Sequence, residues 1–223
     1  MLAPSFLLVL SEVKAVDEYK TVMKEASDSF VEKKSRFIGW CMPVSTEEEA
    51  LSFVKKIKSE NREASHNVYA YALKNGIIRY SDDGEPQGTA GIPVLDVLQK
   101  TGLVDTVVVV TRYFGGILLG GGGLVRAYSH SASIAIAAAV PVTMRECLIM
   151  ELSCDYSRYL KSEAAVAECG GVADDTVFGG DVVIKFHIAE KNLWQLREAV
   201  ADITNGRGVL KETGKAFFGM ENA

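Results

Sequence analysis

Two stretches of the chain join a glycine-rich loop directly to a predicted helix. In the second, six of the 20 glycines fall within nine residues, between Arg112 and Arg126. Backbone N–H groups that glycine exposes, together with the unpaired amides of a first helical turn, form a cradle for an anion. The two arginines add planar, charged donors that suit phosphate. We predict an anion site made of Arg112, Tyr113, Gly115, Gly116, Gly120, Gly121, Gly122, Gly123 and Arg126, with Gly88 and Thr89 from the first loop.

The glycine loops do not match the standard nucleotide motifs. No lysine follows Gly121 to Gly123, as a G-x-x-x-x-G-K-[ST] loop requires, and the spacing after the preceding strand is not G-x-G-x-x-G. These two nucleotide sites are therefore excluded, and the expected occupant is a phosphate or carboxylate group. The alternative remains that the glycines only permit tight turns and close helix-to-sheet packing.

An acidic cluster, Asp82, Asp83 and Glu85, lies beside Gly84 in the first loop. Carboxylates at this spacing can hold Mg²⁺ through a few oxygens and waters, or do acid–base work. They can also contact a partner, or serve only to cap turns. The order does not match an EF-hand loop. All of these roles stay open, and beyond a possible Mg²⁺ we predict no cofactor.

The histidines and tyrosines near these loops have two interpretations each. His66 begins a strand next to Asn67 and is either an acid–base or anion-donating group or a structural histidine. His130 follows Arg126 by four residues on one helix face, where the pair can address an anion or pack at a domain seam. Four tyrosines beside two arginines can stack on bases or pack in the core: Tyr69, Tyr71, Tyr80 and Tyr113, with Arg79 and Arg112. No nucleophile and base share a recognisable motif, so no catalytic residue is predicted.

The amino-acid composition is that of a folded globular protein and restricts which ligands it can bind. The 223 residues are 48% apolar and 24% charged, as in globular domains. With 24 basic and 29 acidic side chains the net charge is −5, which excludes a general polyanion binder and leaves only a local basic patch. Residues 1–140 hold 15 basic and 16 acidic side chains, and residues 141–223 hold 9 and 13. The N-terminal part is therefore the better candidate for meeting an anion.

The cysteines and the N-terminal residues indicate in which cellular compartment the protein is expected. Four cysteines without a C-x-x-C pair indicate neither a zinc site nor a disulfide framework, which favours a reduced, cytoplasmic location. Leu2 to Leu10 is apolar but far shorter than the roughly 20 residues of a membrane span, so no membrane partner is expected. We expect residues 1–17 to lie outside the fold, with a short docking strand as the alternative.

Hydrophobic periodicity and turn signals predict the elements that position these groups. Strands are expected on either side of the basic segment 33–36, followed by a helix over 46–62. An Asn75-Gly76 turn joins strands 66–73 and 77–80. A helix over 92–99, a doubly buried central strand over 104–111 and a small-residue helix over 124–139 complete this part.

A boundary is expected at Pro141. Beyond it the pattern predicts strand, helix, two strands, helix and strand, the β-α-β-β-α-β order of a ferredoxin-like domain. The predicted class is α+β, with an extension over 1–17 and domains over 18–140 and 141–223.

Four segments carry a family resemblance: Ser35-Arg-Phe-Ile-Gly, His66-Asn-Val-Tyr-Ala-Tyr, the loop from Ser81 to Pro93, and the glycine-rich run from Val110 to Ser129. Together they resemble the YigZ/IMPACT family, and the tail is similar to the C-terminal domain of bacterial YigZ-type members. One departure is Val68, where the family often has cysteine.

The resemblance implies an N-terminal domain like the second domain of small-subunit ribosomal protein five. It also implies a C-terminal domain similar to the last domain of elongation factor G, and a link to translation regulation, which eukaryotic relatives perform. Shared fold with translation factors is analogy only.

Two functions from different classes follow. The first is a cytoplasmic, translation-associated binding protein that contacts RNA, the ribosome or a translation-related protein through the anion site. In it His66, Asn67, Tyr69, Asp82, Asp83 and Glu85 contact the partner. The second is an enzyme acting on a small phosphorylated or carboxylated substrate, with a metal held by Asp82, Asp83 and Glu85.

Overall fold

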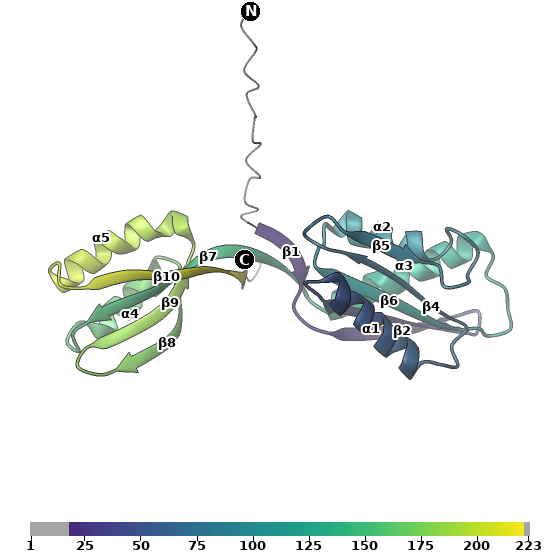
Figure 1. Cartoon of the computed structure of the whole chain (residues 1–223), viewed down its shortest axis with the longest axis horizontal. Helices are drawn as coiled ribbons and strands as arrows, with labels where there is room; N and C mark the ends of the chain where they lie inside the picture. The colour runs from purple at the N-terminus through teal and green to yellow at the C-terminus, as the bar shows by residue number, and fades with distance from the viewer. Residues whose placement is uncertain (1–17, 221–223) are drawn as a thin grey trace, which may run out of the picture.

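The computed structural model describes residues 18–220, so the expectation for 1–17 lies outside the described residues. Two lobes are joined end to end, each built from one five-stranded antiparallel sheet with helices packed on it (Figure 1). The predicted α+β class with two domains is confirmed.

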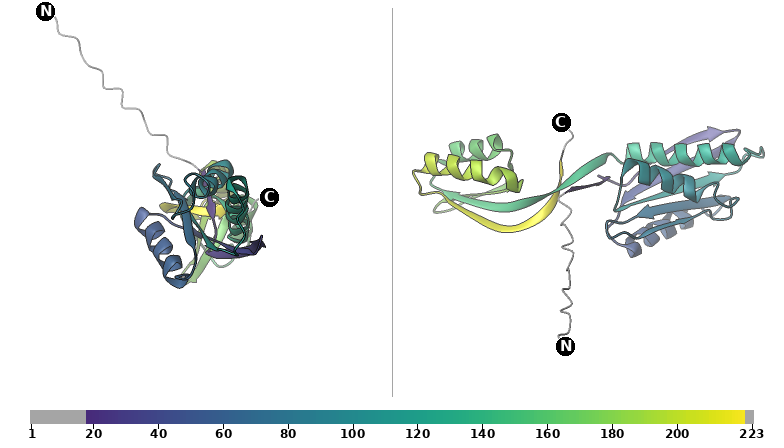
Figure 2. Two further views of the ribbon diagram at one scale, coloured as in Figure 1. Left: turned by 90° about the vertical axis from the view of Figure 1, so that its right-hand side faces the viewer. Right: turned by 90° about the horizontal axis from the view of Figure 1, so that it is seen from above.

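The N-terminal sheet has the strand order β2-β3-β6-β4-β5. Its strands are β2 (Ala26–Glu32), β3 (Ser35–Pro43), β4 (His66–Ala72), β5 (Ile78–Ser81) and β6 (Thr106–Tyr113). As predicted, β6 is central and buried, and Asn75-Gly76 lies in the turn between paired β4 and β5. Helices cover both faces: α2 (Gly91–Thr101) and α3 (Gly121–Ala138) on one, α1 (Glu47–Glu60) on the other (Figure 2).

Local sequence explains the start of α1. The Glu49 amide donates to Thr46 Oγ1 (3.1 Å), and the Ser45 amide donates to Glu49 Oε2 (2.6 Å). These two bonds satisfy amides that would otherwise lack a partner at the helix start. Its buried face consists of Ala50, Phe53, Val54 and Ile57, at the predicted helical spacing.

The small residues of α3 let it pack close to the sheet, as predicted. Its buried positions include Ala127, Ser131, Ala132 and Ala135. Opposite them is Gly39 of β3, where an added Cβ would overlap the Ser131 carbonyl and lie 2.9 Å from Ala135 Cβ. The helix axis is therefore fixed at short range above β3, and α3 begins at Gly121, three residues before its predicted start.

The C-terminal sheet confirms the ferredoxin-like order. Its elements are β7 (Pro141–Cys154), α4 (Tyr159–Glu168), β8 (Val172–Phe178), β9 (Val182–Ile188), α5 (Leu193–Thr204) and β10 (Val209–Met220), with a short 3₁₀ turn at Glu190–Asn192. The strand order is β10-β7-β9-β8, and both helices pack against one hydrophobic cluster.

A fifth strand, β1 (Glu18–Val22), joins the C-terminal sheet although it precedes the N-terminal domain in sequence. It pairs antiparallel with the first residues of β7, from Pro141 to Arg145. The Val104 amide donates to the Lys20 carbonyl (2.9 Å), and Thr21 Oγ1 donates to the Asp105 carbonyl (3.1 Å). Strand β1 is therefore bonded to both lobes.

Candidate functional site

The glycine-rich loop turns sharply before it enters α3. Gly116 and Gly120 have φ of +83° and +73°, a region that favours glycine, and a Cβ at Gly115 would overlap the backbone of Lys34. Gly120 precedes the helix without a side-chain cap, and the Leu124 amide makes the first intrahelical bond, to the Gly120 carbonyl (2.9 Å). The amides of Gly121 to Gly123 thus form the uncapped positive end of the α3 dipole.

Arg112 does not lie free beside this loop, contrary to the prediction that it flanks an open cradle. Its side chain is 6% exposed, and its Nη1 is 2.6 Å from Glu85 Oε1, whose side chain is 3% exposed. The guanidinium lies between the rings of Phe37 and Phe114, 5.5 and 5.4 Å from their centroids. Arg112 is a buried, paired cation, because β6 places it on the same covered face as Val108 and Val110.

Tyr128 of α3 completes this buried group. Its hydroxyl donates to Glu85 Oε1 at 2.7 Å. Burial, and then the neighbouring Glu85 carboxylate, raise the pKa of Tyr128 well above its ordinary value. The phenol therefore stays protonated and serves as a hydrogen-bond donor, and β6, α3 and the Asp82–Gly91 loop are tied together by one carboxylate.

His66 has a fixed tautomer. Its Nδ1 is 2.9 Å from the Asp83 carbonyl oxygen, which can only accept, so Nδ1 carries the proton. Its Nε2 is 3.8 Å from Glu85 Oε1 and has no closer acidic partner in residues 18–220. Neighbouring Asn67 is buried and accepts from Thr111 Oγ1 (2.8 Å).

The three loop carboxylates do not converge on a common point. Asp82 accepts from the amides of Gly88 (3.0 Å), Ala90 (3.2 Å) and Gly91 (2.8 Å) and so caps the start of α2. Asp83 pairs with Lys58 (2.6 Å) and accepts from the Asn67 amide, whereas Glu85 pairs with Arg112. Among the described residues no group of three or more His, Cys, Asp or Glu side chains could hold a metal ion.

The first glycine loop is already occupied by the chain itself. Gly88 donates its amide to Asp82, and the amide and hydroxyl of Thr89 both donate to the Pro86 carbonyl. Gly88 and Thr89 therefore do not offer free donors to an external anion, unlike the first turn of α3.

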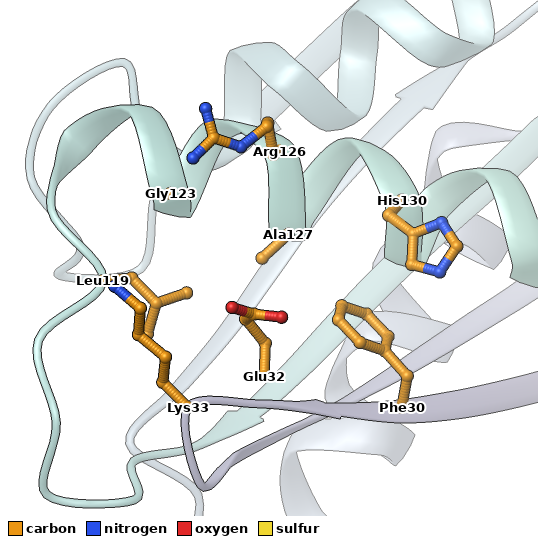
Figure 3. A pocket seen from close by; sticks show the side chains of 8 residues that line it. All are labelled: Phe30, Glu32, Lys33, Leu119, Gly123, Arg126, Ala127 and His130. Carbon is orange, nitrogen blue, oxygen red and sulfur yellow. The ribbon is translucent and has the colours of Figure 1, made fainter.

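Two hollows flank the start of α3, and buried Leu119 lines both. The first, here called the Lys33 groove, has a volume of about 280 Å³ and lies between the β2–β3 turn and α3 (Figure 3). It is lined by Phe30, Glu32, Lys33, Leu119, Gly123, Arg126, Ala127 and His130. The second, the Arg112 cavity, has about 410 Å³. The structure thus separates Arg112 from Arg126 and brings Arg126 together with His130.

Most of the predicted tyrosines are packing groups. Tyr69 and Tyr71 stack on each other (6.2 Å between centroids) on the α1 face, and the hydroxyl of Tyr71 donates to Glu47. The hydroxyl of Tyr113 donates to Asn61 (2.9 Å). Tyr80 and Arg79 are exposed on β5, and neither lines the two hollows.

Sequence reasoning missed Phe30 and Glu32 of β2, Lys33 of the β2–β3 turn, and Tyr128 of α3. The sequence predicts strands on either side of the basic segment 33–36, and in the structure Lys33 and Lys34 form the turn while Arg36 lies in β3. The position of this turn beside α3 depends on the order of strands in the sheet, with β2 at the edge under α3, and no local pattern specifies this order.

Known relatives match both lobes. Residues 33–136 match the family of the Impact N-terminal domain, and residues 152–207 match a domain of unknown function, DUF1949. The IMPACT family member YvyE of Bacillus subtilis is 40% identical over 196 residues, covering 87% of this chain and 90% of that protein. The chain belongs to the IMPACT family.

Other members extend the comparison. YigZ of Escherichia coli is 33% identical over 78% of this chain and 87% of its own length. The Protein IMPACT homolog of Dictyostelium discoideum is 42% identical over 108 residues, which cover 46% of this chain and 30% of that protein. The crystal structure of a hypothetical protein matches with a TM-score of 0.57 and 28% identity over 88% of this chain and 97% of that one. The family thus includes bacterial proteins that match nearly the whole chain and a eukaryotic protein that matches about half of it.

No helix in residues 18–220 has the length and apolar character needed to cross a membrane.

Proposed function

We propose that this protein is a cytosolic, translation-associated binding protein whose N-terminal domain contacts RNA or a ribosomal surface through the Lys33 groove. Membership of a family with eukaryotic translation regulators supports the setting. The observation that carries the contact is that Lys33, Arg126 and His130 line one groove along the first turns of α3 (Figure 3).

The cations of the groove are free to meet an anion. Within the described part of the chain neither Lys33 nor Arg126 lies within 4.0 Å of a carboxylate oxygen, although Glu32 lines the same groove. Arg126 Nη1 is 3.8 Å from the position of a Cβ at Gly122, so the guanidinium lies over the first turn of α3. Fixed charge and helix dipole act together there on a phosphate.

The turn that presents Lys33 is strained. Lys33 and Lys34 form the two-residue turn between β2 and β3, with φ of +46° and +66°. A turn with two positive φ angles normally contains asparagine or glycine, because other residues meet steric resistance. Strain retained at an exposed site is a recognised mark of function, and here it holds a lysine at the edge of the groove.

Co-sedimentation with ribosomes tests the proposal. We expect the double variant Lys33→Ala, Arg126→Ala to bind roughly tenfold more weakly than the parent at low salt. Because about two phosphates are neutralised, the slope of log K against log salt is expected to be about −1.5 for a single-stranded contact. The matched control is Lys211→Ala, Arg207→Ala, which removes two exposed cations outside the groove and leaves binding unchanged.

The absence of co-sedimentation by the parent protein at low salt would refute the proposal, as would equal binding by the groove and control variants. Repeating the measurement after nuclease treatment distinguishes a contact with RNA from a contact with a ribosomal protein. Loss of binding assigns the contact to RNA, and retention assigns it to a ribosomal protein.

A further inference from the structure

The Arg112 cavity lies on the other side of Leu119 from the Lys33 groove, and RNA contact at the groove leaves it without a role. Its volume is about 410 Å³, within the range of small-molecule sites. Much of the wall is apolar, from Pro86, Phe114, Leu118, Leu119 and Leu124. A backbone as large as RNA does not fit a site of this kind, whereas a compact organic molecule does.

The first polar feature of the cavity is the start of α3. Gly120 and Gly121 form part of the wall, and the 18-residue helix has neither a side-chain cap nor an acidic residue in its first turn. The unpaired amide of Gly121 and the positive end of the helix dipole therefore lie at the cavity wall. They favour an occupant with negatively charged oxygens.

The second, independent feature is Arg112. Its side chain forms part of the wall and is more than nine-tenths buried, and its Nε has no hydrogen-bond partner in the described residues. Nearly all buried polar groups are paired, so this guanidinium N–H points to a further hydrogen-bond partner, which can be an ordered water, an ion or a ligand oxygen. Arg112 also pairs with Glu85 through Nη1, lies 3.5 Å from Ser35 Oγ through Nη2, and contacts two aromatic rings.

The third feature is His66, whose Nε2 is available. With Nδ1 committed to the Asp83 carbonyl, Nε2 of this cavity-lining residue can accept from a hydroxyl of the occupant or, when protonated, donate to its oxygen. Glu85 also lines the cavity, but its carboxylate is paired with Arg112, so the start of α3 supplies the uncompensated positive potential. That balance suits a ligand with a single small anionic group rather than a polyanion.

We propose that the Arg112 cavity binds a small organic anion, with a carboxylate or phosphate group at the first turn of α3 and a short apolar body against Phe114, Leu118 and Leu124. Its lining shares only Leu119 with that of the Lys33 groove, and it does not depend on RNA binding.

Titration of the full chain with sodium hexanoate, sodium acetate and inorganic phosphate, followed by ¹H–¹⁵N NMR, tests the site. We expect saturable shifts of the amides of Gly121, Gly122 and Gly123. Hexanoate is expected to bind more tightly than acetate, by up to roughly fourfold for each CH₂ that the apolar wall covers. Tighter binding of phosphate than of hexanoate would assign a phosphate head group, and the reverse a carboxylate.

Two substitutions at Gly121 test whether its backbone amide at the start of α3 contributes to binding. Gly121→Pro removes one amide donor at the first helical position, where proline is tolerated. Gly121→Ala keeps the donor, and its Cβ would meet only Thr89 Cγ2, at 4.0 Å. We expect Gly121→Pro to weaken binding of the tighter probe roughly tenfold or more, the effect of losing a hydrogen bond to a charged group, and Gly121→Ala to change it little.

Equal affinities of the Gly121→Pro and Gly121→Ala variants would overturn the proposal. So would the absence of saturable shifts with every probe up to its solubility limit. The single variant Lys33→Ala, which removes a cation of the Lys33 groove and keeps both Arg126 and the first turn of α3, is expected to bind the probe as the parent does. Failure of either proposal is therefore distinguishable from failure of the other.

Discussion

Because Arg112 is buried and paired with Glu85, its guanidinium is not a free ligand for phosphate. A guanidinium next to a glycine-rich loop resembles a phosphate ligand when only composition and spacing are considered. The alternation of side chains along β6 shows instead that Arg112 is buried. It follows Val108 and Val110 in steps of two and therefore lies on the same covered face of the sheet. The sequence could have placed it there, but not its partner, since Glu85 comes from a loop 27 residues away.

Replacing Glu85 by glutamine tests this buried pair. The substitution keeps the volume and an acceptor for the Tyr128 hydroxyl but leaves the Arg112 charge uncompensated. Loss of one partner from a buried ion pair costs about 3–5 kcal/mol, and we expect a fall of that size in the free energy of unfolding. Equilibrium denaturation measures it, with exposed Glu63→Gln as the matched control, expected within about 0.5 kcal/mol of the parent.

A double variant distinguishes the cost of an unpaired buried charge from the cost of altered side-chain packing. In Glu85→Leu, Arg112→Met both charges are absent, and much of the lost stability should return because no buried charge remains unpaired. A single Glu85→Gln variant as stable as the parent would mean that the pair is not a structural requirement.

The elements of the fold follow from local sequence more fully than the site does. The periodicities of α1, β6 and the C-terminal domain predicted their type and order, and the Ala- and Ser-rich stretch correctly indicated a helix close to the sheet. The pairing of β1 with β7 was not predictable, because β1 lies more than 100 residues from its partner and offers no turn that would fix its register. The position of β2 beside α3, which creates the Lys33 groove, was not predictable from the sequence either.

Close packing of α3 on β3 makes Gly39 the most sensitive point of this interface. In Gly39→Ala the new methyl group would overlap the Ser131 carbonyl, which belongs to a helix backbone and cannot rotate away. We expect a loss of about 3 kcal/mol, at the upper end of overpacking effects, measured by chemical denaturation.

Gly122→Ala is the matched control for Gly39→Ala. Its Cβ would meet only Arg126 Nη1, at 3.8 Å, so replacing a helical glycine should raise stability by roughly 0.5–1 kcal/mol. Equal effects of the two substitutions would contradict close packing as the constraint on α3.

At the scale of the whole molecule, β1 and one lysine join the two lobes. Lys74 comes from the β4–β5 turn, and its Nζ lies 4.5 Å from the ring centroid of Tyr19 and 4.3 Å from that of Phe217 in β10. The two rings pack edge to face, 5.1 Å apart. The Lys74 amide also donates to Asp105 (2.8 Å), so the turn is anchored while its ammonium group contacts β1 and β10.

Removing the charge of Lys74 should loosen the arrangement of the lobes without unfolding either. Lys74→Met keeps an unbranched apolar side chain but loses two cation–π contacts, each worth about 0.5–2 kcal/mol. Spin labels on cysteines introduced at exposed Glu63 and Glu198 report the distance between lobes by pulsed electron spin resonance, because the four native cysteines are buried. We expect a broader distance distribution for Lys74→Met and no change for the exposed control Lys100→Met. Identical distributions for all three proteins would show that the other contacts of β1, and not the charge of Lys74, set the orientation.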